Sequence, residues 1–349
     1  MNIIKQERKK KNSQENQKLK INFLSVKINK TIEIVIVPKK SNKDFIYKNV
    51  AIDLDEKLIL KILSSRYENV FITTISSEND LKELSIRKPD LVFSGVKYFY
   101  FNNKIIWLND FLEDFGIKYI VSSSSALQNE FNKNKAKKIM QKTKVKTADF
   151  FLSFPGKHPS ESSLPLKFPL FIKPLTGGNS RGVDFNSIVY NYASFKAKVL
   201  DIKLNQNLPS LVETYLSGKE YSVGIFEDNT SGNLIAMPIE IIVEKNINGH
   251  CILDFNVKKN DQEKVIIVSD MIIFDKLVKL AKKSFKALGG KSIGRIDIKM
   301  NQSGIPHFIE ANLMPGLEKG YFYRSCLLNF KMSYEDMIFN IANIGLTSH

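Results

Sequence analysis

Apolar runs alternate with amphipathic segments through the first third of the chain. The run IEIVIV at 32–37 has the continuous hydrophobicity of a buried strand, and NVFITTI at 69–75 and DLVFSG at 90–95 repeat it. Between the first two, DEKLILKILSSRY at 55–67 spaces its apolar residues at the helical period. Strands that alternate with helices predict a parallel α/β sheet.

The pattern continues to the end of this first unit. WLNDFLEDFG at 107–116 predicts an amphipathic helix and KYIVSSS at 118–124 predicts another strand, so the unit should close near Ser125. A further helix is expected from about Asn132 to Lys144.

The remaining pattern predicts two α+β units. Strands are expected at 169–174 and 209–216, separated by a Gly-rich turn and a helix near 192–202. The last third predicts a strand pair, a helix and a second strand pair, at 220–228, 234–243, 274–290, 292–300 and 306–313. An NQSG turn joins the last two strands.

Composition places the chain among soluble globular proteins. Its 349 residues, 43% hydrophobic and 25% charged, suffice for two or three compact units. No window approaches the roughly 18 to 20 apolar residues of a membrane span, and no signal-peptide stretch is present, so a cytoplasmic location is expected. Cys251 and Cys326 have no CxxC spacing and give no basis for a disulfide framework.

The formal charge of +16 is compatible with a polyanionic partner. The lysines are spread along helical faces, however, and form no groove-shaped patch with aromatic residues between them. Residues 1–20 are polar and basic, and we expect them to form a disordered tail.

The segment GRIDIKMNQSGIPHFIEANLMPG at 294–316 carries the clearest chemical signal. Strand alternation places its polar side chains on shared faces of a hairpin: Arg295, Asp297 and Lys299 on the first strand, Glu310 and Asn312 on the second. Two carboxylates and an amide oxygen then converge. Such hard oxygen ligands suit Mg²⁺, which takes nucleotide phosphate oxygens as further ligands. The alternative is an edge hairpin with surface charges.

Two other segments carry weaker signals. In FPLFIKPLTGGNSRGVDF at 168–185, a strand delivers Lys173 to a glycine-rich loop whose amides can approach phosphate closely; the alternative is an ordinary flexible turn. The loop has neither Walker A spacing nor a dinucleotide-binding fingerprint. In LVETYLSGKEYSV at 211–223, Glu213 and Glu220 flank a linker that can offer backbone groups to a base.

The order of these segments resembles the ATP-grasp superfamily, specifically the D-alanine:D-alanine ligases, over residues 90–345. Motifs in the same order include KPDLVFSG, PLFIKPLTGGNSRG, ETYLSGKEYSV, SIGRIDIKM and FIEANLMPG. The resemblance implies an α/β chain with the ATP-grasp fold, in which two α+β subdomains clasp ATP beneath an N-terminal parallel α/β (pre-ATP-grasp) domain. The expected division is a tail at 1–20, a substrate domain at 21–128, a central subdomain at 129–217 and a C-terminal subdomain with the metal site at 218–349.

The resemblance also implies residue roles at the nucleotide. Lys133 and Lys173 match the lysines that contact ATP phosphates, and the small loop over those phosphates matches Gly178, Asn179 and Ser180. The adenine and ribose contacts match Glu213, the backbone of Leu216, and Glu220.

The remaining roles concern metal and catalysis. The ligands of two Mg²⁺ ions, with Mn²⁺ as an alternative, match Asp297, Glu310 and Asn312. Arg295 with the Gly316 amide matches the groups that stabilise the reacting oxyanion, and Lys258 matches a lysine of a mobile loop that closes over ATP. The implied chemistry activates a carboxylate as an acyl phosphate, which an amine then attacks to form a peptide bond.

The substrate half departs from the family pattern. The family's loop serine, its tyrosine partner and the serine that holds the second substrate are replaced by Asn179, Lys259 and Tyr321. The N-terminal loops differ too. Because specificity lies in such contacts, the expected substrates are a small carboxylate and an amine, most simply two amino acids, with another carboxylate–amine pair as the alternative to D-alanine.

Two other classes compete with an enzyme. One is an ATP-binding protein without ligase activity, against which the intact set of Arg295, Asp297, Glu310 and Asn312 argues. The other is a nucleic-acid-binding protein, which would leave the metal hairpin without a purpose. No membrane partner is expected, and the resemblance suggests a homodimer formed through the N-terminal domain.

Overall fold

The structure is a computed structural model, and it describes residues 27–38, 51–52, 54–178, 180–228, 231–244, 249, 253, 257, 260 and 262–347. The predicted tail at 1–20 lies outside the described residues. So do Asn179, Lys258 and Lys259.

The N-terminal sheet is parallel, as the alternating pattern predicted. The strand β1 (Ile28–Ile36) lies between β2 (Tyr67–Thr74) and β3 (Leu91–Ser94), and the helices α2 (Glu56–Ser64) and α3 (Glu78–Arg87) connect them. Side chains of β1 enter two separate apolar clusters, so the sheet is covered on both faces. A parallel sheet buried in this way produces the continuous apolar runs seen in the sequence.

One predicted strand of this unit is wrong. Residues 118–124 form only a single parallel bridge, between Tyr119 and Val92. The backbone leaves the extended conformation at Val121, where φ is +70°, and Ser123 then caps α5 (Ser124–Phe131). The helix expected at 107–116 is confirmed as α4 (Leu108–Asp114). It follows a hairpin of β4 (Tyr98–Phe101) and β5 (Lys104–Trp107) that the pattern did not predict.

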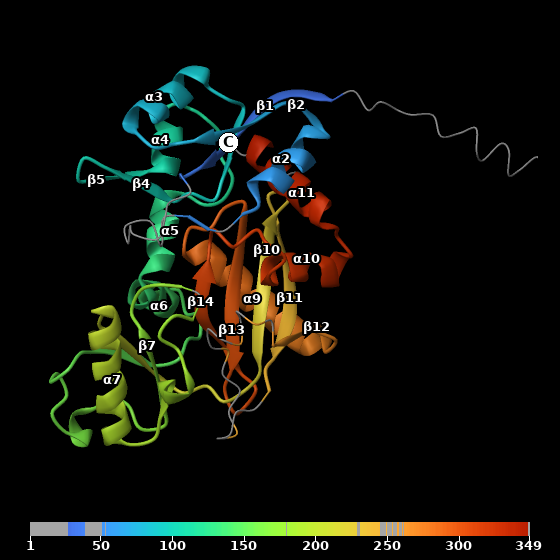
Figure 1. The fold of residues 1–349 in the computed structure, drawn as a ribbon. Helices are drawn as coiled ribbons and strands as arrows, with labels where there is room; N and C mark the ends of the chain where they lie inside the picture. The colour runs from blue at the N-terminus through green and yellow to red at the C-terminus, as the bar shows by residue number, and fades with distance from the viewer. Residues whose placement is uncertain are drawn as a thin grey trace, which may run out of the picture.

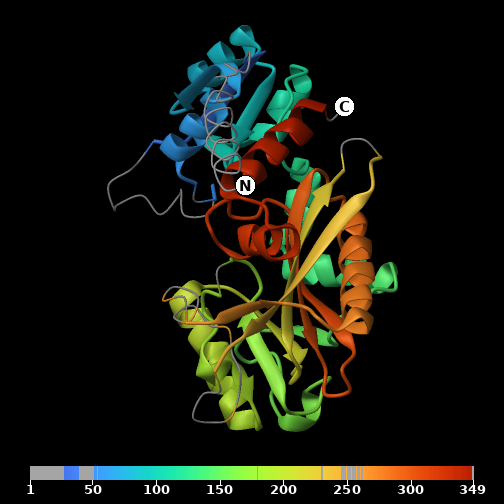
Figure 2. The ribbon, with the colours of Figure 1, turned by 90° about the vertical axis from the view of Figure 1, so that its right-hand side faces the viewer.

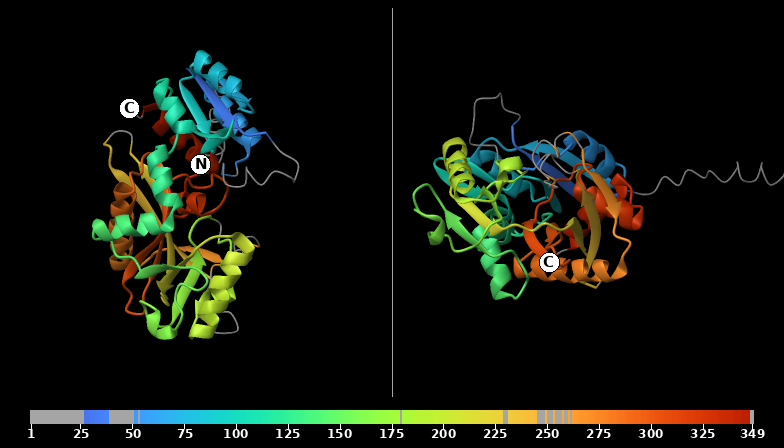
Figure 3. Two further views of the ribbon diagram at one scale, coloured as in Figure 1. Left: turned by 90° about the vertical axis from the view of Figure 1, so that its left-hand side faces the viewer. Right: turned by 90° about the horizontal axis from the view of Figure 1, so that it is seen from below.

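A small antiparallel sheet forms the second unit. Its strand order is β6-β9-β7-β8, with bounds β6 (Phe150–Ser153), β7 (Leu170–Pro174), β8 (Ile188–Val189) and β9 (Ser210–Thr214). The predicted helix is confirmed as α7 (Tyr192–Gln206), which packs on this sheet. The helices α5 and α6 (Lys133–Lys142) lie between this unit and the N-terminal sheet, along one side of the molecule (Figure 3).

The third unit is a five-stranded antiparallel sheet in the order β12-β11-β10-β13-β14. Its strands are β10 (Glu220–Glu227), β11 (Leu234–Ile242), β12 (Lys264–Ile267), β13 (Ile293–Met300) and β14 (Pro306–Asn312). Figure 1 shows it at the centre of the molecule, beside the small sheet and below the N-terminal unit.

Helices cover both faces of the large sheet. A Cβ at Gly294 would meet Phe285 of α9 (Met271–Ala287), whereas one at Gly224 would meet Ser325 of α10 (Tyr321–Phe330). The two glycines therefore admit helices on opposite faces.

The last helix returns to the beginning of the chain. The helix α11 (Tyr334–Thr347) packs against α2 and β3 of the N-terminal unit (Figure 2). Lys118 reinforces this contact by donating to the Leu346 carbonyl oxygen at 2.7 Å. None of the helices in the described part of the chain is long and apolar enough to cross a membrane.

We predict that Gly294→Ala destabilises the protein by about 1–3 kcal/mol, because the added methyl would lie 2.5 Å from the buried Phe285 ring. Urea unfolding measures the change. Gly320→Ala is the control, since no atom lies within 4 Å of a Cβ at that position. Equal free energies of unfolding for the two variants would contradict the packing argument.

Candidate active site

The polar face of the large sheet is assembled by strand register. Arg295 lies opposite Gly224 and Asn312, and Asp297 lies opposite Ser222 and Glu310. The hairpin predicted from alternation is thus confirmed, and its polar residues lie on the face that α10 covers.

Asp297 is the most heavily contacted carboxylate of this face. Arg295 donates to it from Nε at 3.0 Å and from Nη2 at 2.9 Å. The Ser222 hydroxyl donates at 2.7 Å and the Asn312 amide at 3.4 Å. Burial opposes the charge of Arg295, but the Asp297 carboxylate outweighs it and raises the pKa of the guanidinium.

Glu310 completes the oxygen set. It is half-buried, its side chain makes no hydrogen bond or ion pair with the other described residues, and its charge acts on both Lys173 and Arg295. No group of three or more His, Cys, Asp or Glu side chains within the described ranges is placed to hold a metal ion. The donors are two carboxylates and one amide oxygen, which fit a cation that fills its remaining positions with ligand oxygens and water, as Mg²⁺ does.

Lys133 and the glycine loop at 177–178 line the same cavity as Asp297 and Glu310. Lys133, the first residue of α6, donates from Nζ to the Gly177 carbonyl oxygen at 2.6 Å. Gly177 has a φ of +99°, which glycine adopts without strain. The Ser180 hydroxyl ties the loop to the Leu253 carbonyl oxygen at 3.0 Å.

Glu213, Lys137 and Lys173 form a buried charge cluster beside these residues. Glu213 receives Lys137 Nζ on Oε1 at 2.5 Å and Lys173 Nζ on Oε2 at 2.8 Å. Burial would raise the pKa of Glu213, but the two ammonium groups lower it to about 2. Glu213 is therefore ionised, and an ionised carboxylate only accepts hydrogen bonds.

The linker from Glu213 to Glu220 is held in place at both ends. The Gly218 N–H donates to the Met300 carbonyl oxygen at 2.9 Å, and a Cβ at Gly218 would lie 2.6 Å from that oxygen. Lys299 pairs with Glu220 at 2.8 Å. The linker thus follows the end of β13 closely.

These residues surround a first cavity of about 920 Å³, including its part open to solvent. Nine of the predicted site residues line it: Lys133, Lys173, Gly178, Ser180, Glu213, Leu216, Glu220, Asp297 and Glu310. One part of its wall is apolar, formed by Ala148, Phe171, Leu216 and Ile309. A ring system can lie there, while anions face the lysines and the glycine loop.

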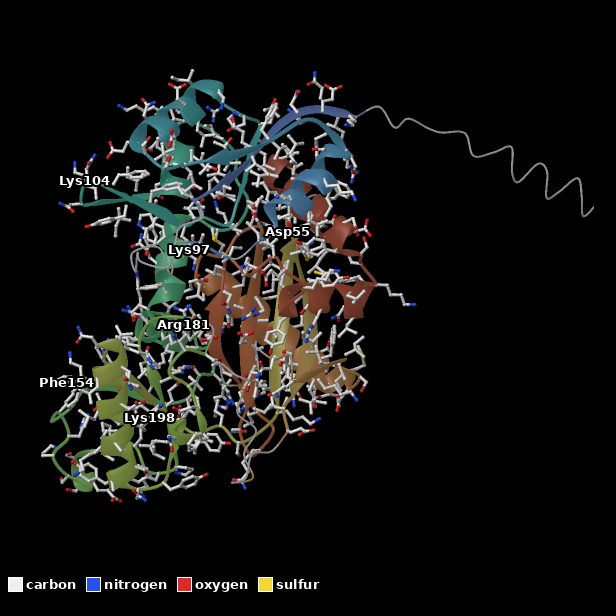
Figure 4. All side chains as sticks on the ribbon, viewed as in Figure 1. Asp55, Lys97, Lys104, Phe154, Arg181 and Lys198 are labelled. Atoms are coloured by element: carbon white, nitrogen blue, oxygen red, sulfur yellow. The ribbon has the colours of Figure 1, made fainter. Side chains whose placement is uncertain are left out.

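A second cavity adjoins the first, and both are lined by Lys133, Gly177, Gly178, Arg181 and Glu310. It adds the other predicted residues Arg295, Asn312 and Gly316. Figure 4 places Arg181 beside the small sheet and Lys97 above it, at the lower edge of the N-terminal unit.

The aromatic residue Tyr321 lines the second cavity from α10. Its hydroxyl donates to Glu263 Oε1 at 2.8 Å, and the Arg295 guanidinium lies 5.5 Å from the centre of its ring. Burial and Glu263 raise the pKa of Tyr321. The ring therefore covers one face of the Arg295 guanidinium.

Sequence reasoning missed three residues of this site, Lys137, Arg181 and Ser222. It placed Lys299 on the hairpin face but gave it no role. Lys137 follows Lys133 by one helical turn, so the spacing alone could have placed both on one face of α6. Ser222 carried no local signal, because its partner comes from a neighbouring strand. The pairing of Lys299 with Glu220 likewise depends on a neighbouring strand. The predicted roles of Asn179 and Lys258 fall on residues outside the described ranges.

The arrangement of two sheets around a cleft, with the N-terminal parallel unit above, defines the ATP-grasp fold. The structure of the Bacillus anthracis D-alanine–D-alanine ligase complexed with ATP has a similar fold, with a TM-score of 0.65 and 20% identity, and covers 91% of this chain and 97% of that one. The family model described as the D-ala D-ala ligase C-terminus matches residues 139–343. The chain therefore belongs to the D-alanine–D-alanine ligase family.

Curated relatives agree with this assignment. A D-alanine–D-alanine ligase of Aquifex aeolicus is 28% identical over 265 residues, which are 75% of this chain and 84% of the relative. That of Pediococcus pentosaceus is 28% identical over 232 residues, 65% of this chain and 61% of the relative.

We predict that Glu213→Gln lowers the free energy of unfolding by about 3–5 kcal/mol at pH 7, because it leaves two buried ammonium groups facing each other. The pKa of Glu213 in the folded protein, about 2, lies below its ordinary value of 4.5. The ion pairs therefore stabilise the protein above about pH 4.5, and this contribution is lost as the pH falls toward 2.

The measurement is denaturant unfolding of wild type and variant between pH 7 and pH 3. Their difference should persist down to about pH 4.5 and then shrink. Glu240→Gln is the control, because within the described ranges Glu240 forms an ion pair with the exposed Lys219, and its loss should cost less than about 1 kcal/mol. A pH-independent difference would exclude ionised Glu213 as the cause.

Proposed function

We propose that the protein is an ATP-dependent ligase that forms a peptide bond between two small amino acids through an acyl phosphate. The observation that carries this proposal is the junction of the two cavities. Residues that suit phosphate, namely Lys133, Arg181 and the loop at 177–178, line both cavities together with Glu310. A phosphoryl group held there is open to a nucleotide on one side and to a second substrate on the other.

The first cavity suits ATP. Its apolar wall accepts the adenine ring, with Glu213 as acceptor for the exocyclic amine and the linker backbone near Leu216 beside it. Glu220 lies at the cavity wall where it can accept from ribose hydroxyls. Lys133 and Lys173 then face the phosphates.

The hairpin residues suit magnesium. Asp297, Glu310 and Asn312 would hold two Mg²⁺ ions, which neutralise charge on the transferred phosphoryl group when bound. The Arg295 guanidinium uses Nε and Nη2 on Asp297, so its planar fork is held toward the second cavity. There it can stabilise negative charge on the activated carbonyl, together with the Gly316 amide.

The second cavity suits the carboxylate and amine substrates. D-alanine is the first candidate for both, because the curated relatives carry that name. Tyr321 at the wall makes another amino-acid pair the alternative, since its ring occupies space beside Arg295. A cytoplasmic location and a homodimer through the N-terminal unit complete the proposal and rest on family membership.

The test of function is release of ADP and phosphate from Mg²⁺-ATP with D- and L-amino acids, singly and in pairs, with products identified by mass spectrometry. We expect turnover with D-alanine or with a related pair, and a dipeptide product. ATP binding without stimulation by any pair would overturn the ligase proposal in favour of a non-catalytic ATP-binding protein. Absence of ATP binding would overturn both.

We further predict that Glu310→Gln lowers kcat by about 10²–10³-fold, because it removes a carboxylate that would hold the Mg²⁺ ions, which neutralise charge on the transferred phosphoryl group when bound. Calorimetry should show that it weakens binding of Mg²⁺-ATP more than binding of metal-free ATP. Asp275→Asn is the control, because Asp275 is an exposed carboxylate on α9, which packs on the other face of the sheet. An equal loss in both binding measurements would argue against a metal role for Glu310.

A further inference from the structure

One charged residue next to the nucleotide cavity has no direct access to it. Lys137 is 0% exposed and lines neither the first nor the second cavity of the site. Its ammonium reaches Glu213 from behind the cavity wall. Burying an ammonium group is unfavourable unless it is paired, so this position needs a physical explanation.

The surroundings of Lys137 aim its ammonium at Glu213. Nζ donates to Thr147 Oγ1 at 2.5 Å and lies 5.3 Å from the centre of the Phe150 ring. The Thr147 hydroxyl in turn donates to the Phe308 carbonyl oxygen at 2.9 Å, which anchors it to β14. Contacts with Thr147, Phe150 and Glu213 therefore fix the position of the Lys137 ammonium.

With both lysines protonated, the cluster holds one positive charge in excess. Burial lowers the pKa of Lys137, and the Glu213 carboxylate opposes this effect. Lys137 and Lys173 each take one oxygen of Glu213, so a single carboxylate is divided between two ammonium groups. Of these two lysines, Lys173 is the one that lines the first cavity, where the charge of Glu310 also acts on it. If Lys137 were neutral, Glu213 would serve as the full counter-ion of Lys173 and would cancel its charge toward the cavity.

We infer that Lys137 is a positioning residue of the nucleotide site: it pairs with Glu213 from behind, which keeps the charge of Lys173 available to phosphate and fixes the orientation in which the ionised Glu213 selects a purine with an amino group at C6 over one with a carbonyl group there. The inference rests on the proposed function, because it takes a nucleotide as the occupant of the first cavity.

Selection between the two bases follows from hydrogen-bond polarity. The C6 amino group of adenine donates, whereas the C6 carbonyl oxygen of hypoxanthine or guanine accepts. An ionised carboxylate attracts the first and repels the second. The low pKa of Glu213 agrees with this reading, and removal of one of its two ammonium neighbours would raise that pKa.

A purely structural role predicts something different. Methionine has nearly the length of lysine and can fill the same buried space, but removing one partner of a buried ion pair destabilises the protein. Glu213 also keeps Lys173 as a partner when Lys137 is lost. A structural role alone would therefore leave nucleotide preference unchanged.

The experiment compares Lys137→Met with wild type in the full chain. Calorimetry gives Kd for ATP and for ITP, which differ in the C6 group, and steady-state assays give kcat and KM for ATP. We expect Kd for ATP to rise by about tenfold, because Glu213 then cancels the charge of Lys173. The ratio of Kd for ITP to Kd for ATP should fall by about tenfold, because Lys137 no longer fixes the Glu213 carboxylate. The value of kcat at saturating ATP should change less than about threefold, because Lys137 contacts no reacting atom.

Two further variants keep the test decisive. Lys138→Met removes an exposed lysine from the same helix and should change neither Kd. Thr147→Val removes the hydroxyl that orients Lys137 and should lower the ratio of Kd for ITP to Kd for ATP by a smaller factor. This variant tests the inference independently if Lys137→Met does not fold.

The outcomes separate this inference from the proposed function. Lower thermal stability of Lys137→Met and Thr147→Val with an unchanged ITP-to-ATP ratio would show that Lys137 is structural and would overturn the inference. Wild-type protein that binds neither nucleotide would refute the proposed function itself. A shifted ratio in a variant that still binds ATP would support the inference whether or not a dipeptide product had been found.

Discussion

The antiparallel pairing of β13 with both β10 and β14 is the constraint on which the site depends. Because side chains alternate along a strand, this register places Arg295, Asp297 and Lys299 on one face, beside Ser222 and Glu220 of β10 and Asn312 and Glu310 of β14. A slip of one residue in β13 would turn its three charges toward α9 and into the apolar core. The core that buries the other face therefore also holds the chemistry in register.

Burial then decides what the charges can do. Asp297 and Glu213 are both buried, and cations contact both of them. Arg295 pairs with Asp297, and Lys137 and Lys173 pair with Glu213. Glu310 is the carboxylate of the hairpin that the described side chains leave without a hydrogen bond or ion pair. Cations thus pair with the carboxylates Asp297 and Glu213. Lys133 and Glu310, which we propose meet phosphate and metal, line both cavities.

The two cavities differ in how closely they follow the family pattern. The first is lined by residues at every matched nucleotide position that the structure describes. The second receives Lys97 from the N-terminal unit and Tyr321 from α10, and Lys97 pairs at 3.1 Å with Glu130 of α5. Glu130 also accepts from the Leu313 amide, so the N-terminal unit is coupled to the loop that follows β14. Sequence differences in the N-terminal unit can therefore alter the second cavity and leave the first cavity unchanged.

Local periodicity in the sequence determined the parallel N-terminal sheet, the helices α6, α7 and α9, and the shared polar face of the hairpin, because each depends on the spacing of residues within one element. It failed at 118–124, where a positive φ at Val121 ends the extended backbone. Resemblance added the nucleotide residues, but neither source indicated that Lys137 and Lys173 share Glu213. Only the tertiary structure decided that, because α6, β7 and β9 meet there and the charge of each side chain is set by neighbours distant in sequence.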